Sequence, residues 1–291
     1  MKKRSLGAGA PAVTAVGFGA MPLSISERPD EAQGVKVIHA ALDAGMTLID
    51  TADVYCIDDD DIGHNERLVA KALAAWSGDR DSILVASKAG LTRPGGRWER
   101  DGRPARIRAA CERSLEALGV DAIDLYQFHA PDPAVPFADS VGAFAELQQE
   151  GKVRWVGLSN VSVAEIEAAG GIVEVASVQN RFNPFFQESP HDGALKYCTD
   201  NGIAYLAYSP VGGGRLNKKL PDHPVLQPIA AAHSASPHAV VLAWALARSP
   251  NLIVIPGART VEHVLDSAGS AELELSAEEL RAIDEGEFST D

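Results

Sequence analysis

Long apolar runs are missing from this 291-residue chain, which excludes the usual helical membrane anchor. No uninterrupted apolar stretch reaches the roughly 18 residues that a spanning helix needs. After MKKR the sequence passes directly into SLGAGAPAV, which is too short and too broken by glycine and proline for the apolar part of a signal peptide. We therefore expect a soluble cytoplasmic protein with no membrane partner.

Cysteine is scarce as well. The three cysteines, Cys56, Cys111 and Cys198, are an odd number without CxxC or CxxH spacing. This pattern gives neither a disulfide framework nor a zinc site, and it favours a reducing compartment. The histidines show no metal-ligand spacing either, so no metal is predicted.

Positive charge is the third thing in short supply. With 26 Lys and Arg against 40 Asp and Glu, the formal net charge is −14, which repels phosphate backbones. We expect no nucleic-acid partner. We expect a small-molecule substrate, and a protein that is a monomer or a weak homo-oligomer. The 46% of hydrophobic residues are ample for a large core.

The sequence is rich in short β-type apolar runs that alternate with helical patterns. This alternation is typical of βα units around a parallel sheet. Eight such units without a linker or a topological reversal predict one α/β domain over residues 1–291, a closed (β/α)8 TIM barrel. The expected strands are 15–19, 47–50, 83–87, 123–128, 153–159, 175–179, 203–208 and 252–256.

Helices are expected between these runs, and a short hairpin before them. A helix over 30–45 ends at Gly45, and we expect Ala32, Val35, Ile38 and Leu42 to form its buried face. A second helix, 104–119, begins with proline and ends with glycine. Residues 3–14 precede the first unit and predict a β-hairpin that caps the bottom of the barrel, with a role in stability.

Polar residues stand where the expected strands end. In a barrel of this kind chemistry gathers at the carboxyl ends of the strands. The second, third and fourth runs end in Asp50, Lys88 and His129. An isolated interior carboxylate is very costly, so we expect Asp50 to pair with Lys88 and to raise the pKa of that amine. We also expect the ammonium to lower the pKa of the neighbouring Tyr55, making it a better acid, while His129 donates to a carbonyl oxygen.

Several motifs together resemble the aldo-keto reductase family over essentially the whole chain. They are LIDTADVY, ASKAG, YQFHAPDP, GLSN, VQNRFNP, AYSPVGGG and VIPGART, in the family's order. The resemblance implies a barrel that binds NADPH at its top and reduces aldehydes or ketones. Asp50, Tyr55, Lys88 and His129 would be catalytic, with Tyr55 as the general acid.

The resemblance also implies a cofactor site. Ser159, Asn160 and Gln179 would hold the carboxamide, Tyr208 would stack on the nicotinamide, and Arg259 would reach the 2′-phosphate. Arg259 favours NADP, although NAD stays possible because His263 and Ser267 stand where the family often has other residues. The remaining cofactor positions implied are Gly19, Ala20, Met21, Asp50, Ser209, Pro210, Val211, Gly213, Arg215, Gly257 and His263, within loops that include 209–216.

A basic loop follows the third run. It carries Trp98 with Arg93, Arg97, Arg100 and Arg103. A solvated loop is the simpler interpretation. The sharper one is a lid that closes over a negatively charged substrate, with Trp98 joining Tyr55 and His129 as substrate-binding residues.

Two other functions fit parts of the pattern. Lys88 at a strand end also fits the Schiff-base nucleophile of an aldolase barrel. The cofactor motifs alone would fit a redox-sensing module that binds nicotinamide with little turnover. The run Asp58 to Asp61 fails the calcium-loop pattern, and GFGAMP at 17–22 lacks the third glycine of a Rossmann fingerprint.

Overall fold

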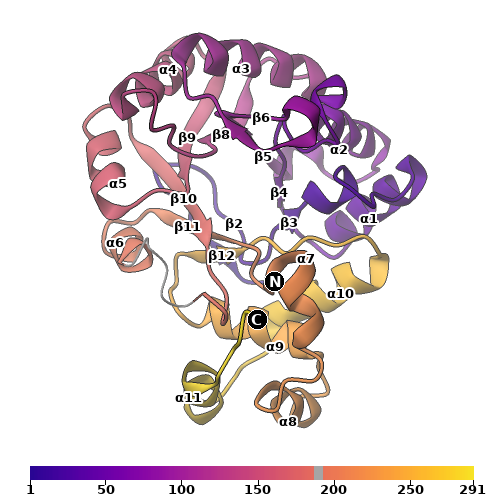
Figure 1. The fold of residues 1–291 in the computed structure, drawn as a ribbon. Helices are drawn as coiled ribbons and strands as arrows, with labels where there is room; N and C mark the ends of the chain where they lie inside the picture. The colour runs from indigo at the N-terminus through magenta and orange to yellow at the C-terminus, as the bar shows by residue number, and fades with distance from the viewer. Residues whose placement is uncertain (187–192) are drawn as a thin grey trace.

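The protein is an eight-stranded parallel barrel surrounded by helices (Figure 1). The computed structural model describes residues 1–186 and 193–291. Bridges from Val16 to Val254 and from Gly19 to Gly257 join the two edge strands and close the sheet. The eight parallel strands, in spatial order, are β3 (Phe18–Gly19), β4 (Leu48–Asp50), β5 (Leu84–Ala89), β8 (Ile123–Phe128), β9 (Val153–Ser159), β10 (Val175–Arg181), β11 (Ala204–Tyr208) and β12 (Leu252–Val254).

The expected barrel is confirmed, with different strand bounds. The first and last strands are shorter than expected because residues around them pair only through the isolated closing bridges. The third strand runs one residue past Lys88, and the sixth runs on to Arg181. All the same, the polar residues named above lie at or next to the carboxyl ends of their strands.

The helices begin and end where local chemistry satisfies their terminal backbone groups. Asp30 caps α1 by accepting from the Gln33 amide at 2.8 Å, and Gly45 follows the helix with φ of 87°. Gly119 ends α3 in the same left-handed region. The helices are α1 (Glu31–Asp43), α2 (His64–Ala75), α3 (Pro104–Leu118), α4 (Phe137–Gln149), α5 (Val163–Gly170), α6 (Ala194–Asp200), α7 (Gly213–Leu216), α8 (Leu226–Ala232), α9 (Pro237–Leu246), α10 (Val261–Gly269) and α11 (Ala277–Glu285).

The buried face of α1 is rotated from the expected one. Ile38 and Leu42 are buried, but Ala32 is exposed and Val35 is only half-buried. Gly34 and Val37 take their places. Gly34 lies where a Cβ would come within 3.0 Å of Leu68, so α1 and α2 approach closely through it.

The N-terminal segment forms the expected hairpin. Strands β1 (Lys3–Arg4) and β2 (Val13–Thr14) pair antiparallel, and the Gly7 amide donates to the Ala176 carbonyl at 2.8 Å. Leu6 and Val13 join inward-facing residues of the barrel, Leu48, Leu125 and Leu206 among them, in one buried cluster. The hairpin therefore closes one end of the barrel with apolar side chains.

A second hairpin was not expected. Strands β6 (Leu91–Thr92) and β7 (Glu99–Arg100) pair antiparallel within the basic segment that follows β5. Trp98 lies just before β7, in the loop that joins these two paired strands.

No single helix in residues 1–186 and 193–291 has the length and apolar character needed to cross a bilayer. Two consecutive helices, Leu226–Ala232 and Pro237–Leu246, reach that length and apolar composition only when they are counted together, and they are bent by 91° relative to each other.

Leu6→Ala should destabilise the fold without disturbing the opposite end of the barrel. Removing a fully buried leucine side chain typically costs about 2–5 kcal/mol, and Leu6 is 2% exposed. Urea unfolding measures the loss. The same change at Leu265, which is 53% exposed, provides a matched control and should cost far less. Equal losses in the two variants would contradict the role of the hairpin as a plug.

Candidate active site

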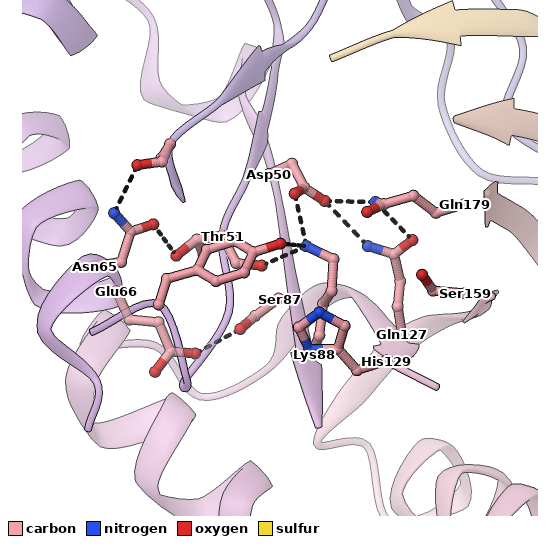
Figure 2. A network of polar contacts seen from close by, with 12 residues as sticks. Asp50, Thr51, Asn65, Glu66, Ser87, Lys88, Gln127, His129, Ser159 and Gln179 are labelled. Atoms are coloured by element: carbon pink, nitrogen blue, oxygen red, sulfur yellow. Dashed lines mark hydrogen bonds and ion pairs between the residues drawn. The ribbon is translucent and has the colours of Figure 1, made fainter. Parts of the chain in front are cut away.

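Four polar side chains meet at the mouth of the barrel. Asp50 ends β4, Tyr55 follows it, Lys88 lies on β5 and His129 follows β8. The Lys88 Nζ donates to Asp50 Oδ1 at 2.6 Å and to the Thr51 carbonyl at 2.9 Å (Figure 2). It also donates to the Tyr55 hydroxyl at 2.9 Å. The four residues expected to meet are therefore brought together.

The site is almost closed to water. Lys88 is fully buried, and Asp50, Tyr55 and His129 are each less than 10% exposed. Burial lowers the pKa of Lys88, outweighing the opposing pull of Asp50. Asp50 does act to raise the pKa of this amine, as expected, but desolvation is the larger effect and the net shift is downward.

The expectation that the pKa of Tyr55 would be lowered is wrong. Burial raises the pKa of Tyr55 well above its usual value, and the Asp50 carboxylate adds to the shift. Burial also lowers the pKa of His129 well below its usual value, with Lys88 acting in the same direction. Near neutral pH the phenol keeps its proton and the imidazole is uncharged.

Two amides support Asp50 from inside the barrel. Gln179 Nε2 donates to Asp50 Oδ2 at 2.7 Å, and Gln127 Nε2 donates to the same oxygen at 3.3 Å. Gln179 was expected to hold the carboxamide of a cofactor, and here its nitrogen is engaged by the carboxylate. Gln127 was not anticipated. Its signal in the sequence is an amide between the two aromatic residues Tyr126 and Phe128.

A second polar layer lies behind the catalytic group, at the start of α2. Asn65 Nδ2 donates to the Ala20 carbonyl at 2.9 Å and to Ser24 Oγ at 2.7 Å, while Thr51 Oγ1 donates to Asn65 Oδ1 at 2.6 Å. Ser87 donates to the buried Glu66 carboxyl (Figure 2). This layer was not predicted. The polar residues Asn65 and Glu66 at the start of α2 are the feature of the sequence that could have indicated it.

The ends of β8, β9 and β11 are tied together around Asn160. This residue has φ of 58°, a strained value for a side chain other than glycine. Its Nδ2 donates to the His129 carbonyl at 2.9 Å and to Ser159 Oγ at 3.1 Å, and its Oδ1 accepts from the Tyr208 hydroxyl at 2.7 Å. The expected cofactor residues Ser159, Asn160 and Tyr208 thus form one rigid group.

The glycine-rich segment after β11 turns sharply. Ser209, Gly212 and Gly213 all have positive φ, a sequence of backbone conformations that makes concave arrays of N–H groups. Pro210 and Val211 lie within this turn. Arg215 Nη2 donates to the Thr290 carbonyl at 2.7 Å, so its charged end points to the C-terminal segment.

The loops after β3 and β12 lie against each other. Gly19 and Gly257 pair, and a Cβ on Gly257 would lie 2.6 Å from Pro22. Arg259 donates to the carbonyls of Pro22 at 3.1 Å and Ser26 at 2.8 Å. Ala20 and Met21 begin the short turn held in this way, and His263 lies exposed in the first turn of α10.

Two aromatic rings border the phenol ring of Tyr55. Trp98 lies edge-on to Tyr55 with ring centroids 6.4 Å apart, and the His129 ring is 5.8 Å away. Trp98 is 48% exposed, so it borders both the phenol and solvent. The expected substrate-binding residues Trp98, Tyr55 and His129 therefore share one wall.

The arginines expected to form a basic lid do not act together. Arg93 turns inward, where its guanidinium lies 4.0 Å over the Trp98 ring. Arg97 and Arg103 pair with the nearby carboxylates Glu99 and Asp101. Arg100 is exposed and forms no ion pair among the described residues. The segment therefore carries one buried and one exposed unpaired cation rather than a cationic cover.

The geometry argues against Lys88 as an amine nucleophile. A Schiff base needs a free lone pair on nitrogen. Here a carboxylate, a carbonyl and a phenol oxygen accept hydrogen bonds from the three N–H positions of an ammonium. Burial lowers the pKa of Lys88 overall, so the argument against a nucleophile rests on these three engaged positions.

A closed parallel barrel with an acid, an amine, a phenol and an imidazole at its carboxyl end defines an enzyme-type barrel site. The chain belongs to the aldo/keto reductase family, whose model matches residues 15–287.

Relatives and solved structures agree with this assignment. Aldo-keto reductase str7 of Strobilurus tenacellus is 34% identical over 93% of this chain and 88% of its own length. A probable aldo-keto reductase of Glycine max is 32% identical over 93% of this chain and 84% of its own length. A glycerol dehydrogenase from Gluconobacter oxydans superposes with a TM-score of 0.84 at 29% identity, over 97% of this chain and 94% of that one. An aldo-keto reductase from Klebsiella pneumoniae in complex with NADPH superposes with a TM-score of 0.80 at 29% identity, over 98% of this chain and 95% of that one.

A buried acid beside the site should make stability depend on pH. Burial, with the Glu66 carboxyl adding to it, raises the pKa of Asp53 to about 8, whereas an aspartate in an unfolded chain titrates near 4. The folded state holds this proton more tightly, so the contribution of Asp53 to stability is lost as pH rises from about 4 through about 8.

Asp53→Asn removes that titration. Relative to the parent, the variant should gain stability steadily from about pH 4 to about pH 8 and change little above. Urea unfolding at a series of pH values measures the difference. Asp60→Asn, at an exposed position of the same loop, controls for the loss of one negative charge. A stability difference that did not vary with pH would refute the assignment.

Proposed function

We propose that the protein is an NADP(H)-dependent oxidoreductase that reduces aldehydes or ketones to alcohols, with Tyr55 as the general acid. The observation that carries the proposal is the contact of the Tyr55 hydroxyl with Lys88 Nζ at 2.9 Å, beside an Asp50 carboxylate that holds Lys88 at 2.6 Å. Family membership supports an oxidoreductase, and the neighbour with bound NADPH supports a nicotinamide cofactor.

The proton of Tyr55 is directed toward the open side of the site. Its oxygen already accepts a hydrogen bond from Lys88, so its own O–H is free to donate elsewhere. The Tyr55 ring is bordered by His129 and Trp98, which would line the space next to the hydroxyl. A carbonyl oxygen placed there would receive hydrogen bonds from Tyr55 and from the uncharged His129 imidazole.

Lys88 and Asp50 stabilise the negative charge that forms on Tyr55. When Tyr55 gives up its proton, a phenolate is left in a buried site, where an unpaired charge is costly. The Lys88 ammonium, 2.9 Å away, stabilises it. Asp50, fixed by Gln179 and Gln127, keeps Lys88 in place.

The rim fits an elongated polar ligand. The backbone of Ser209 to Gly213 turns through left-handed conformations, and a Cβ at Gly214 would meet nothing within 4 Å. We assign this turn to the pyrophosphate, Ser159, Asn160 and Gln179 to the carboxamide, and Tyr208 to the nicotinamide ring. NADPH, when bound, supplies the hydride. Gly19, Ala20, Met21 and Gly257 would approach it by backbone alone, with Arg259 and His263 nearest the adenosine phosphate.

Tyr55→Phe should lower kcat for aldehydes by about 10² to 10⁴, the usual contribution of a positioned proton donor. NADPH affinity should stay within about twofold, because Phe preserves the ring. Cofactor absorbance follows the rate and fluorescence titration gives the affinity. Tyr197→Phe, on α6, is the matched control. An unchanged rate in the Tyr55 variant would remove the proposed acid. Tight NADPH binding without turnover in the parent would favour a redox-sensing module instead.

Arg259→Ala tests the preference for NADP. Loss of one charge-assisted hydrogen bond to a phosphate typically costs about 1.5–3 kcal/mol, so NADPH affinity should fall by roughly 10- to 100-fold and NADH affinity much less. Fluorescence titration with both cofactors measures the ratio. Arg154→Ala, at an exposed position near Asp124, is the control. An equal loss for NADPH and NADH would mean that Arg259 serves only to hold the loop at Pro22 and Ser26.

A further inference from the structure

A cavity of about 380 Å³ lies outside the catalytic group, next to the start of α3. It is bounded by the loop after β4, by the β6–β7 hairpin segment and by one side of α3. Three of its seven lining residues are arginines. The lining residues are Asp59, Ile62, Thr92, Arg93, Pro94, Arg106 and Arg113.

Arg93 is buried with part of its guanidinium unused. The residue is 6% exposed. Its Nη2 donates to the carbonyls of Cys56 at 3.2 Å and Ile57 at 2.9 Å, but its Nε and Nη1 have no hydrogen-bond partner anywhere in the described residues. Buried donors without acceptors cost free energy, and a charged group costs more. An acceptor in the cavity would remove this cost.

Arg106 and Arg113 are similarly short of anionic partners. Within residues 1–186 and 193–291, Arg106 forms no ion pair, and Arg113 reaches only Asp53 at 3.9 Å. By contrast, Arg108 on the same helix pairs with Glu146 and Glu150. Two arginines with so little anionic pairing therefore line one cavity on a chain with a net charge of −14.

The neighbouring carboxyl groups do not neutralise the cavity. Asp59 lines it, and one of its oxygens accepts from the Gly95 amide at 2.9 Å. Asp53 lies beside Arg113, and its raised pKa of about 8 keeps it largely protonated near neutral pH. The lining itself holds three guanidinium groups and one carboxyl group, that of Asp59.

We propose that this cavity binds a small oxyanion, a phosphate or carboxylate group, through Arg93, Arg106 and Arg113. Planar guanidinium groups match the paired oxygens of such anions. The site goes beyond the proposed reductase activity and would affect its substrate side. Arg93 fixes the carbonyls that follow Tyr55 and packs on Trp98, so an anion on Arg93 braces that wall.

Calorimetric titration with inorganic phosphate tests the site on the protein saturated with NADPH, at constant ionic strength. Saturating the cofactor first keeps phosphate away from the adenosine-phosphate region. We expect one saturable site, weakened about tenfold or more in Arg106→Gln through loss of a charge-assisted hydrogen bond. Arg113→Gln should behave alike, and both positions are partly exposed, so the fold should tolerate the changes. Arg108→Gln is the matched control and should bind as the parent does.

Absence of saturable binding to the parent, or equal binding to parent and Arg106→Gln, would overturn the proposal. This measurement needs no turnover, so its failure is distinct from failure of the proposed reductase function. Kinetics then identify the source of the anion. If Arg106→Gln raises KM for glyceraldehyde 3-phosphate but not for glyceraldehyde, the oxyanion belongs to the substrate. If neither KM changes while phosphate binding is lost, the site takes a free anion.

Discussion

The buried ammonium of Lys88 is the constraint on which the rest of the site depends. A charge with no exposure to water is tolerated only when its hydrogen bonds are satisfied, and Lys88 has three acceptors within 2.9 Å. Two of them, Asp50 and the Thr51 carbonyl, come from the end of one strand. The third is the phenol of Tyr55. The need to pair one cation thus fixes where the acid lies.

The periodicity of the sequence predicts the fold, but it does not predict the direction of the pKa shifts in the site. Eight short apolar runs separated by helical patterns leave few topologies, and the residues that end those runs are brought together by the barrel itself. The sign of a pKa shift depends on burial, which the sequence does not give. Pairing alone suggested a lowered pKa for Tyr55, but complete enclosure raises it. Burial likewise gives the pKa of Lys88 a net downward shift, which pairing with Asp50 alone does not predict.

Residues that act from behind the site carry weaker signals still. Gln127 lies within the short strand IDLYQF, where nothing in a linear pattern marks it as the partner of Asp50. The arginines of the segment after β5 share one composition, yet Arg93 is buried whereas Arg97 is exposed and paired. The β6–β7 pairing decides which side chain turns inward, and pairing of two-residue strands leaves almost no periodicity to read.

Thr51 connects the chemistry to the loop that follows β3. Its carbonyl accepts from Lys88, and its hydroxyl donates to Asn65, whose amide in turn holds the Ala20 carbonyl and Ser24. One residue therefore binds the ammonium through its backbone and the supporting layer through its side chain. Because these bonds are buried and mutually satisfied, a shift of the β3 loop would have to break a bond to Asn65 or displace Thr51. The position of the catalytic cation and the shape of the neighbouring rim are thus coupled through a single threonine.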